Sequence, residues 1–163
     1  MKFLKHIVPA VVILIALSGC YTFRGQTAGA IKTIAIPTFE NESTEFGLAE
    51  RVTTQLTTGF QSDGTLRVTA SDQADAVLHG TVLRVEDLPY SARADQTVDE
   101  YRFSLTCQIE LIDTKTQQPI WTQNSTEWAT YPYTGSLENR DQAIQEAVTK
   151  LQQDILNRIV GSW

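Results

Sequence analysis

Residues 101–112, YRFSLTCQIELI, alternate apolar and polar side chains almost without interruption. Successive side chains of a strand point to opposite faces, so this pattern predicts a long strand, Val98 to Ile112, with one apolar and one polar face. A sheet with a single apolar face is covered by a layer of helices on that side. Cys107 falls on the apolar face, and we expect it to be buried in the core.

The residues after this strand predict a hairpin. Asp113 to Pro119 has the composition of a turn, and Ile120 to Ala129 is rich in Thr and Trp, which favours a strand paired antiparallel with the first. The stretch Tyr131-Pro132-Tyr133-Thr134-Gly135 then predicts a rigid, aromatic connection.

Two segments have the spacing of amphipathic helices. Apolar residues recur at four-residue intervals from Leu48 to Phe60, which predicts a helix over Glu45 to Phe60, closed by Ser62-Asp63-Gly64. Arg140 to Val160 carries a similar stripe and predicts a longer helix. Its expected N-cap, capping-box and terminating residues are Asn139, Gln142 and Gly161.

Three shorter strands are expected before the long one, at Ile31 to Ile36, Thr65 to Thr69 and Ala76 to Val85. The apolar residues of the third do not alternate strictly, which suggests a bulge near Gly80 or burial on both faces. We therefore predict an α/β (α+β) two-layer sandwich, with a mixed four- to five-stranded sheet and two helices packed on one face. A single domain over residues 31–163 suits the chain length of 163 residues.

The first nineteen residues have the pattern of a lipoprotein signal peptide. Lys2 and Lys5 flank the start of an uncharged apolar run, Ile7 to Leu17, that is too short to cross a bilayer. Leu17-Ser18-Gly19-Cys20 resembles the bacterial lipobox, in which the cysteine is lipidated and becomes the first residue. The alternative is a soluble secreted protein with an incidental cysteine at this position.

Lipidation of Cys20 implies a membrane anchor, because several acyl chains hold far more firmly than one. Residues 20–30 would form the lipidated tether. The residue after Cys20 is Tyr21 and not the aspartate that marks inner-membrane retention, which favours the outer membrane and a domain facing the periplasm.

The charge and the reactive side chains argue against several functions. Removal of the signal peptide leaves 11 basic and 19 acidic residues, a net charge of −8, which disfavours nucleic-acid binding. His79 would be the only imidazole left, and Cys107 lies between Leu105 and Ile109 on an apolar face. We therefore predict no enzyme, no cofactor and no metal site. An enzyme that uses His79, Cys107 or the acidic residues Glu40, Glu42 and Glu45 is the less favoured alternative.

Five stretches, taken in order, resemble the LptE family of outer-membrane lipoproteins of lipopolysaccharide assembly. They are residues 34–41 (IAIPTFEN), 47–53 (GLAERVT), 63–68 (DGTLRV), 74–82 (ADAVLHGTV) and 100–103 (EYRF). The resemblance implies a non-enzymatic plug that sits inside the β-barrel translocon LptD and helps to deliver lipopolysaccharide to the outer leaflet.

The resemblance also nominates site residues. Basic residues of the family are associated with lipopolysaccharide, which points here to Lys115 in the hairpin and to Arg84 and Arg93 near the loop before the long strand. Tyr131 and Tyr133 are the expected contacts with the barrel, and we expect them to enter its lumen together with the Asp113 to Pro119 hairpin.

Residues 34–41 and 74–80 are also similar to periplasmic lipoproteins of the LpoB and CsgG type, which activate peptidoglycan synthases or form secretion pores. A synthase activator is expected to have a long linker after its cysteine, and a pore former a transmembrane hairpin. The sequence has a tether of about ten residues and no such hairpin, so this alternative ranks second.

Overall fold

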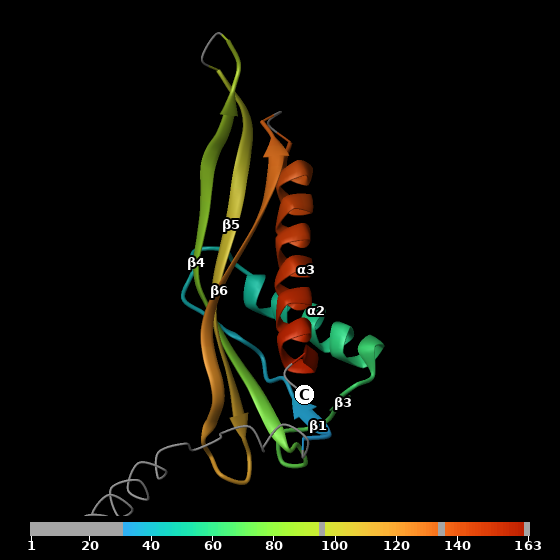
Figure 1. Ribbon diagram of the computed structural model, residues 1–163. Helices are drawn as coiled ribbons and strands as arrows, with labels where there is room; N and C mark the ends of the chain where they lie inside the picture. Colours follow the sequence, from blue (N-terminus) through green and yellow to red (C-terminus); the bar gives the residue numbers. More distant parts are fainter. Residues whose placement is uncertain (1–30, 95–96, 134–135, 162–163) are drawn as a thin grey trace, which may run out of the picture.

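The computed structural model describes residues 31–94, 97–133 and 136–161, which form one sheet with two helices on one of its faces (Figure 1). The strands are β1 (Thr33–Ala35), β2 (Glu40–Asn41), β3 (Arg67–Val68), β4 (Ala76–Ala92), β5 (Val98–Asp113) and β6 (Pro119–Pro132), and the helices are α2 (Leu48–Asp63) and α3 (Leu137–Gly161). The predicted two-layer sandwich is confirmed, with six strands where four or five were expected.

The sheet has the order β3-β1-β4-β5-β6, and β2 also pairs with β4. Strands β1 and β2 run parallel to β4, whereas β5 is antiparallel to both β4 and β6. The three long strands therefore form a meander, and the short strands lie beside one half of it (Figure 1). The predicted long strand and its antiparallel hairpin are both confirmed.

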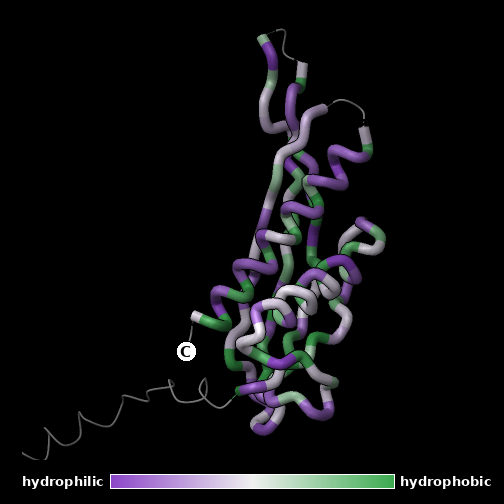
Figure 2. Tube along the Cα trace, turned by 90° about the vertical axis from the view of Figure 1, so that its right-hand side faces the viewer, coloured by the Kyte–Doolittle hydropathy of each residue, from purple (hydrophilic) through white to green (hydrophobic). Residues whose placement is uncertain are grey.

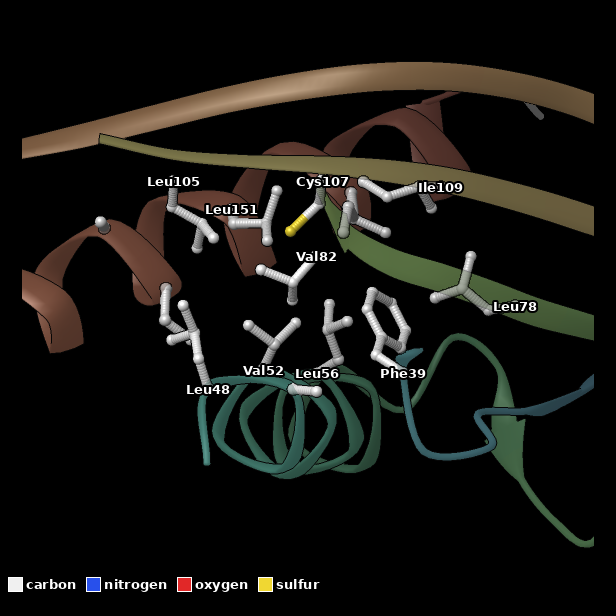
Figure 3. Packing of buried hydrophobic residues seen from close by; sticks show 14 of the residues in the cluster. Phe39, Leu48, Val52, Leu56, Leu78, Val82, Leu105, Cys107, Ile109 and Leu151 are labelled. Atoms are coloured by element: carbon white, nitrogen blue, oxygen red, sulfur yellow. The ribbon is translucent and has the colours of Figure 1, made fainter. Parts of the chain in front are cut away.

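The core lies between the sheet and the two helices. Side chains of α2 and α3 meet the inward-facing residues of β4 and β5, as Figure 3 shows for Val52, Leu56, Leu151, Leu105 and Ile109. Helix α3 lies along β6 and β5, and α2 crosses it near the middle of the sheet (Figure 2). Full burial of such a side chain contributes about 1.5–3 kcal/mol, so this face of the sheet holds the fold together.

Cys107 is buried in this core, as predicted. Burial raises the pKa of its thiol to about 12, well above the value for an exposed cysteine. The reactive thiolate is thus scarce in the folded protein at neutral pH.

We expect a polar thiol reagent at pH 8 to label Cys107 only after denaturation. The variant Cys107→Ala should lose about 1 kcal/mol of unfolding free energy, as for the removal of a small buried side chain. Labelling followed by mass spectrometry, with and without urea, checks the first result, and a urea melt checks the second. Rapid labelling of the native protein would show that the side chain is not buried.

Helix α2 begins at Leu48 and not at the predicted Glu45. Asn41 and Ser43 form a turn of their own, in which the Asn41 side chain accepts from the Ser43 backbone N–H at 3.0 Å and donates to the Glu45 carbonyl at 2.8 Å. Gly47 then adopts a left-handed conformation (φ 76°), which cannot continue a helix backwards. Gly64 ends α2 as predicted.

Helix α3 and strand β6 also extend further than predicted. Helix α3 begins at Leu137, so Asn139 lies inside its first turn and is not the N-cap, and Gly161 is its last residue. Tyr131 and Pro132 belong to β6 and pair with β5, so the aromatic stretch is partly strand. Thr134 and Gly135 lie outside the described residues.

Strand β4 continues to Ala92, seven residues beyond the predicted end at Val85. Its register with β5 shifts between Val82 and Arg84, which confirms the predicted bulge near Gly80. No helix among the described residues is long and apolar enough to cross a membrane. The predicted signal peptide, Cys20 and the predicted tether lie outside the described part of the chain.

Candidate functional site

The long strands give the domain two opposite ends. At about 3.3 Å per residue, the 17 residues of β4 span roughly 55 Å. We call the end where β4 leaves and β5 returns the hairpin end; it projects past α3 in Figure 1. The other end, with the turn 114–118 between β5 and β6 and the short strands β1 and β3, is the turn end.

The three basic residues nominated from the sequence do not come together. Lys115 lies in the turn at the turn end. The Asp113 carboxylate stabilises this turn by accepting hydrogen bonds from the backbone N–H groups of Lys115 and Thr116. Arg84 lies midway along β4, and Arg93 follows the last residue of β4 at the hairpin end. They cannot form a single anion site.

Each of these three cations also has a carboxylate partner. Lys115 lies 3.6 Å from Asp75, Arg84 lies 3.4 Å from Glu86 and Arg93 lies 2.6 Å from Asp99. The pKa of Asp75 is lowered, mainly by the Lys32 backbone N–H and the Thr33 hydroxyl that donate to its carboxylate. The side chains of these cations are mostly exposed, so each pair contributes little to stability.

Aromatic residues gather at the hairpin end. The rings of Tyr101 and Tyr131 stack with centroids 6.0 Å apart, and Tyr133 lies 5.3 Å from Tyr101. Tyr101 and Tyr131 are half-buried, whereas Tyr133 is exposed. Tyr131 and Tyr133 therefore lie at the opposite end of the sheet from Lys115, so the two features that are expected in the barrel lumen are separated by the length of the long strands.

A network of charged groups, which we call the Arg140 clasp, joins the tyrosines to the helices. The Arg140 guanidinium donates two hydrogen bonds to the Glu45 carboxylate, at 2.7 and 3.1 Å, and two to Asp87, at 2.9 and 3.1 Å. Its carbon lies 5.5 Å from the centre of the Phe103 ring. The Tyr131 hydroxyl donates to Asp87 at 2.8 Å. Four segments of the chain thus meet at one cation.

The clasp shifts the pKa values of Arg140 and Tyr131. Hydrogen bonds to Glu45, and then to Asp87, raise the pKa of Arg140 above that of a free arginine. Burial, and then the hydrogen bond to Asp87, raise the pKa of Tyr131 to about 12. Arg140 is therefore charged in the clasp, and Tyr131 takes part in it as a neutral hydrogen-bond donor.

His79 stands in a row with Glu110 and Thr122 across three strands. These residues line a hollow of about 130 Å³ on the sheet face that the helices do not cover, and the sequence alone did not bring them together. The Thr122 hydroxyl donates to Glu110 at 3.2 Å, so the carboxylate and not the imidazole contacts the hydroxyl. A hydrolytic triad needs the opposite order, with the imidazole in the middle.

No group of three or more metal-ligating side chains occurs among the described residues. The exposed face of the sheet instead carries polar and aromatic side chains. Trp128 and Tyr90 lie on it with ring centroids 6.0 Å apart, and the Arg102 guanidinium lies 5.9 Å from the Trp128 ring. This group was not predicted from the sequence. Trp128 lies in a predicted strand, and a tryptophan on the exposed face of a strand is a signal for such a surface group.

These features define a class of protein: a two-layer α+β domain whose exposed polar and aromatic side chains suit binding through its surface.

Solved structures share this fold. A protein from Chlamydia trachomatis is 9% identical, covers 82% of this chain and 98% of its own, and superposes with a TM-score of 0.60. A Xanthomonas campestris protein is 10% identical, with coverages of 78% and 84% and a TM-score of 0.59. A minor lipoprotein from Acinetobacter baumannii is 19% identical, with coverages of 78% and 90% and a TM-score of 0.52.

At these identities the structures establish the fold alone. A comparison with curated proteins finds no match. The family model described as LptE, lipopolysaccharide-assembly, matches residues 31–159. The chain therefore belongs to the LptE family, which confirms the resemblance found in its sequence and agrees with the expectation of a protein that is not an enzyme.

Proposed function

We propose that this chain is a lipid-anchored outer-membrane lipoprotein that plugs an LptD-type β-barrel and helps to assemble it for lipopolysaccharide insertion. The family match over residues 31–159 carries the proposal. The lipobox ending in Cys20 supplies the anchor. The domain faces the periplasm and the barrel lumen.

The shape and surface of the domain support this role. Its long axis, along β4 to β6, suits insertion end-on into a barrel, with the projecting hairpin end leading (Figure 1). Tyrosine is enriched at protein interfaces because its ring is apolar and its hydroxyl can form a hydrogen bond. Tyr133 is exposed at that end and Tyr131 is held beneath it by the Arg140 clasp, so Tyr133 is the leading contact.

Lipopolysaccharide is the proposed second ligand of this domain. Lys115, Arg84 and Arg93 would contact it as separate positions, because they are spread along the sheet. Each would have to exchange a protein carboxylate for a lipid phosphate. Contacts of this kind weaken with salt.

A photocrosslinking amino acid at Tyr133 tests the partner. We expect adducts with a β-barrel protein of the outer membrane, because this position leads the domain into the lumen. The same probe at Lys115, at the turn end, measures how far the lumen encloses the domain. Adducts from Tyr133 with peptidoglycan synthases alone would contradict the proposal and support the LpoB-type alternative.

A separate prediction concerns the anchor. Labelled palmitate should enter the parent protein and be absent from Cys20→Ala, which should stay unprocessed or mislocalised, because the anchor depends on this one thiol. Cys107→Ala serves as the matched control and should be labelled like the parent, since Cys107 is buried. Equal labelling of Cys20→Ala and the parent would contradict the lipoprotein assignment.

A further inference from the structure

The face of the sheet opposite the helices carries a cluster of four side chains near the hairpin end, which we call the Arg102 patch. It consists of Leu88 and Tyr90 on β4, Arg102 on β5 and Trp128 on β6. Leu88 is the cross-strand partner of Arg102, and Trp128 is the partner of Ser104, the next residue on the same face. Cross-strand partners share a face, so these side chains stand together.

The patch exposes large apolar side chains to water. Leu88 is 42% exposed, Tyr90 52% and Trp128 42%. Isolated exposed apolar residues are ordinary on protein surfaces, whereas neighbouring ones that surround a cation are not. Trp, Tyr and Arg are the residues that contribute most to binding at protein interfaces.

Arg102 is the centre of the patch and lacks a counter-ion. The ion pairs among the described residues do not include it. Arg67 and Arg158 also lie outside those pairs, but they are exposed to water, whereas Arg102 is half-buried. Its Nε is buried and has no hydrogen-bond partner among the described residues. An unsatisfied buried donor is unfavourable, so binding of an acceptor to the remaining guanidinium donors would offset part of this cost.

The surroundings of Arg102 favour a single negative charge. Glu86 and Glu100 lie on the same face, Glu86 opposite Ser104 and Glu100 two residues before Arg102. Two further cations border the patch: Arg84 pairs with Glu86 at 3.4 Å, and the Lys150 Nζ lies 5.2 Å from the centre of the Trp128 ring and 2.8 Å from Glu146. Because both of these cations already have a carboxylate partner, Arg102 supplies the one unpaired positive charge here among the described residues. The remaining neighbours on this face, Thr106, Thr126 and Thr130, are neutral and can form hydrogen bonds, as at the rim of a protein interface.

We propose that the Arg102 patch is a docking surface for a protein partner, in which Arg102 binds an aspartate or glutamate side chain beside Trp128. This inference rests on the proposed function, in which the partner is the barrel and the acidic residue lies on its inner wall. A planar guanidinium binds a carboxylate through two parallel hydrogen bonds. The aromatic rings exclude water from that pair and strengthen it.

The test measures how much β-barrel protein co-purifies with the tagged, lipidated full-length chain in mild detergent. Arg102→Met keeps the aliphatic length and removes the charge and the unsatisfied Nε. We expect it to recover at least ~10-fold less barrel than the parent, as for the loss of a central interface residue. The matched control Arg67→Met, an exposed arginine at the turn end, should recover the same amount within about twofold.

Thermal unfolding separates binding from folding. Arg102→Met should melt at the parent's temperature or above, because it removes a buried donor that has no partner. A lower melting temperature together with lower recovery would show a structural role and overturn the inference. Arg102→Lys should recover an intermediate amount, since it keeps the charge and loses the fork geometry.

The outcomes distinguish the two proposals. If the parent recovers no barrel, the proposed function fails, and this inference fails with it. If the parent and Arg102→Met recover equal amounts, only the inference fails.

A photocrosslinker at Trp128 provides a second test. It should give adducts with the barrel near an acidic residue, and adducts with lipopolysaccharide alone would show that the patch binds a lipid and not a protein.

Discussion

Arg140→Ala is expected to lower the free energy of unfolding by about 3 kcal/mol, because it leaves two carboxylates in a half-buried site without their cation. The side chains of Arg140, Glu45 and Asp87 are 27%, 28% and 30% exposed, respectively. Water therefore screens them only in part. The charged hydrogen bonds of Arg140 to both carboxylates are lost together.

The size of this effect also follows from what the clasp connects. Glu45 precedes α2, Asp87 lies on β4 and Arg140 lies near the start of α3. The variant frees the start of α3 from the strand that bears Asp87, and the Tyr131 hydroxyl is left on a carboxylate that has lost its counter-ion. We therefore expect the hairpin end to loosen before the rest of the domain.

Arg51→Ala is the matched control. Arg51 donates to Asp141 at 2.8 Å and also connects α2 with α3, but these side chains are 37% and 61% exposed. An exposed pair contributes about 0.2–1 kcal/mol, so this variant should be nearly as stable as the parent. Urea denaturation of the three proteins measures the difference. Equal losses from Arg140→Ala and Arg51→Ala would show that the clasp is no stronger than a surface ion pair.

The sequence predicted the parts of the fold that rest on local periodicity. The alternation of residues 101–112 predicted the correct phase for β5. The inward residues from Phe103 to Leu111 are buried under the helices, whereas the outward residues, apart from Ser104, keep some exposure. Both helices were predicted for the same reason. The start of α2 was misplaced because Asn41 and Ser43 form a separate turn, and because the left-handed Gly47 stands before the helix.

Other features depend on residues far apart in the chain, and a single sequence does not reveal them. The outer half of β4 has no apolar pattern, and it is a strand because it pairs with β5. Arg140 finds Glu45 and Asp87 across 95 and 53 residues. Lys115, Arg84 and Arg93 were proposed as ligand-binding residues because they are basic. In the structure, the length of the sheet separates Lys115 from Arg93. The Arg102 patch likewise emerges only from the register of three strands.

Gly80 has a packing role that its sequence pattern did not reveal. The predicted bulge near it lies between Val82 and Arg84, whereas Gly80 itself pairs regularly with Ile109 on β5. The glycine is required by the Phe39 side chain, which lies directly over it on the helix-covered face. Phe39 is almost fully buried, and the Thr53 hydroxyl accepts a hydrogen bond from its backbone N–H at 3.0 Å. The missing Cβ at Gly80 is therefore the space that the aromatic ring fills.

Gly80→Ala is accordingly expected to destabilise the protein by about 2–3 kcal/mol, because the added Cβ would overlap the buried Phe39 ring and force it to move. The matched control is Gly161→Ala, where nothing lies within 4 Å of an added Cβ and α3 ends, so stability should not fall. Phe39→Leu should partly rescue Gly80→Ala: in a double-mutant cycle by urea denaturation, the two losses should fall short of additivity by about 1 kcal/mol or more. Strict additivity, or a Gly80→Ala variant as stable as the parent, would contradict the close packing of Phe39 on this glycine.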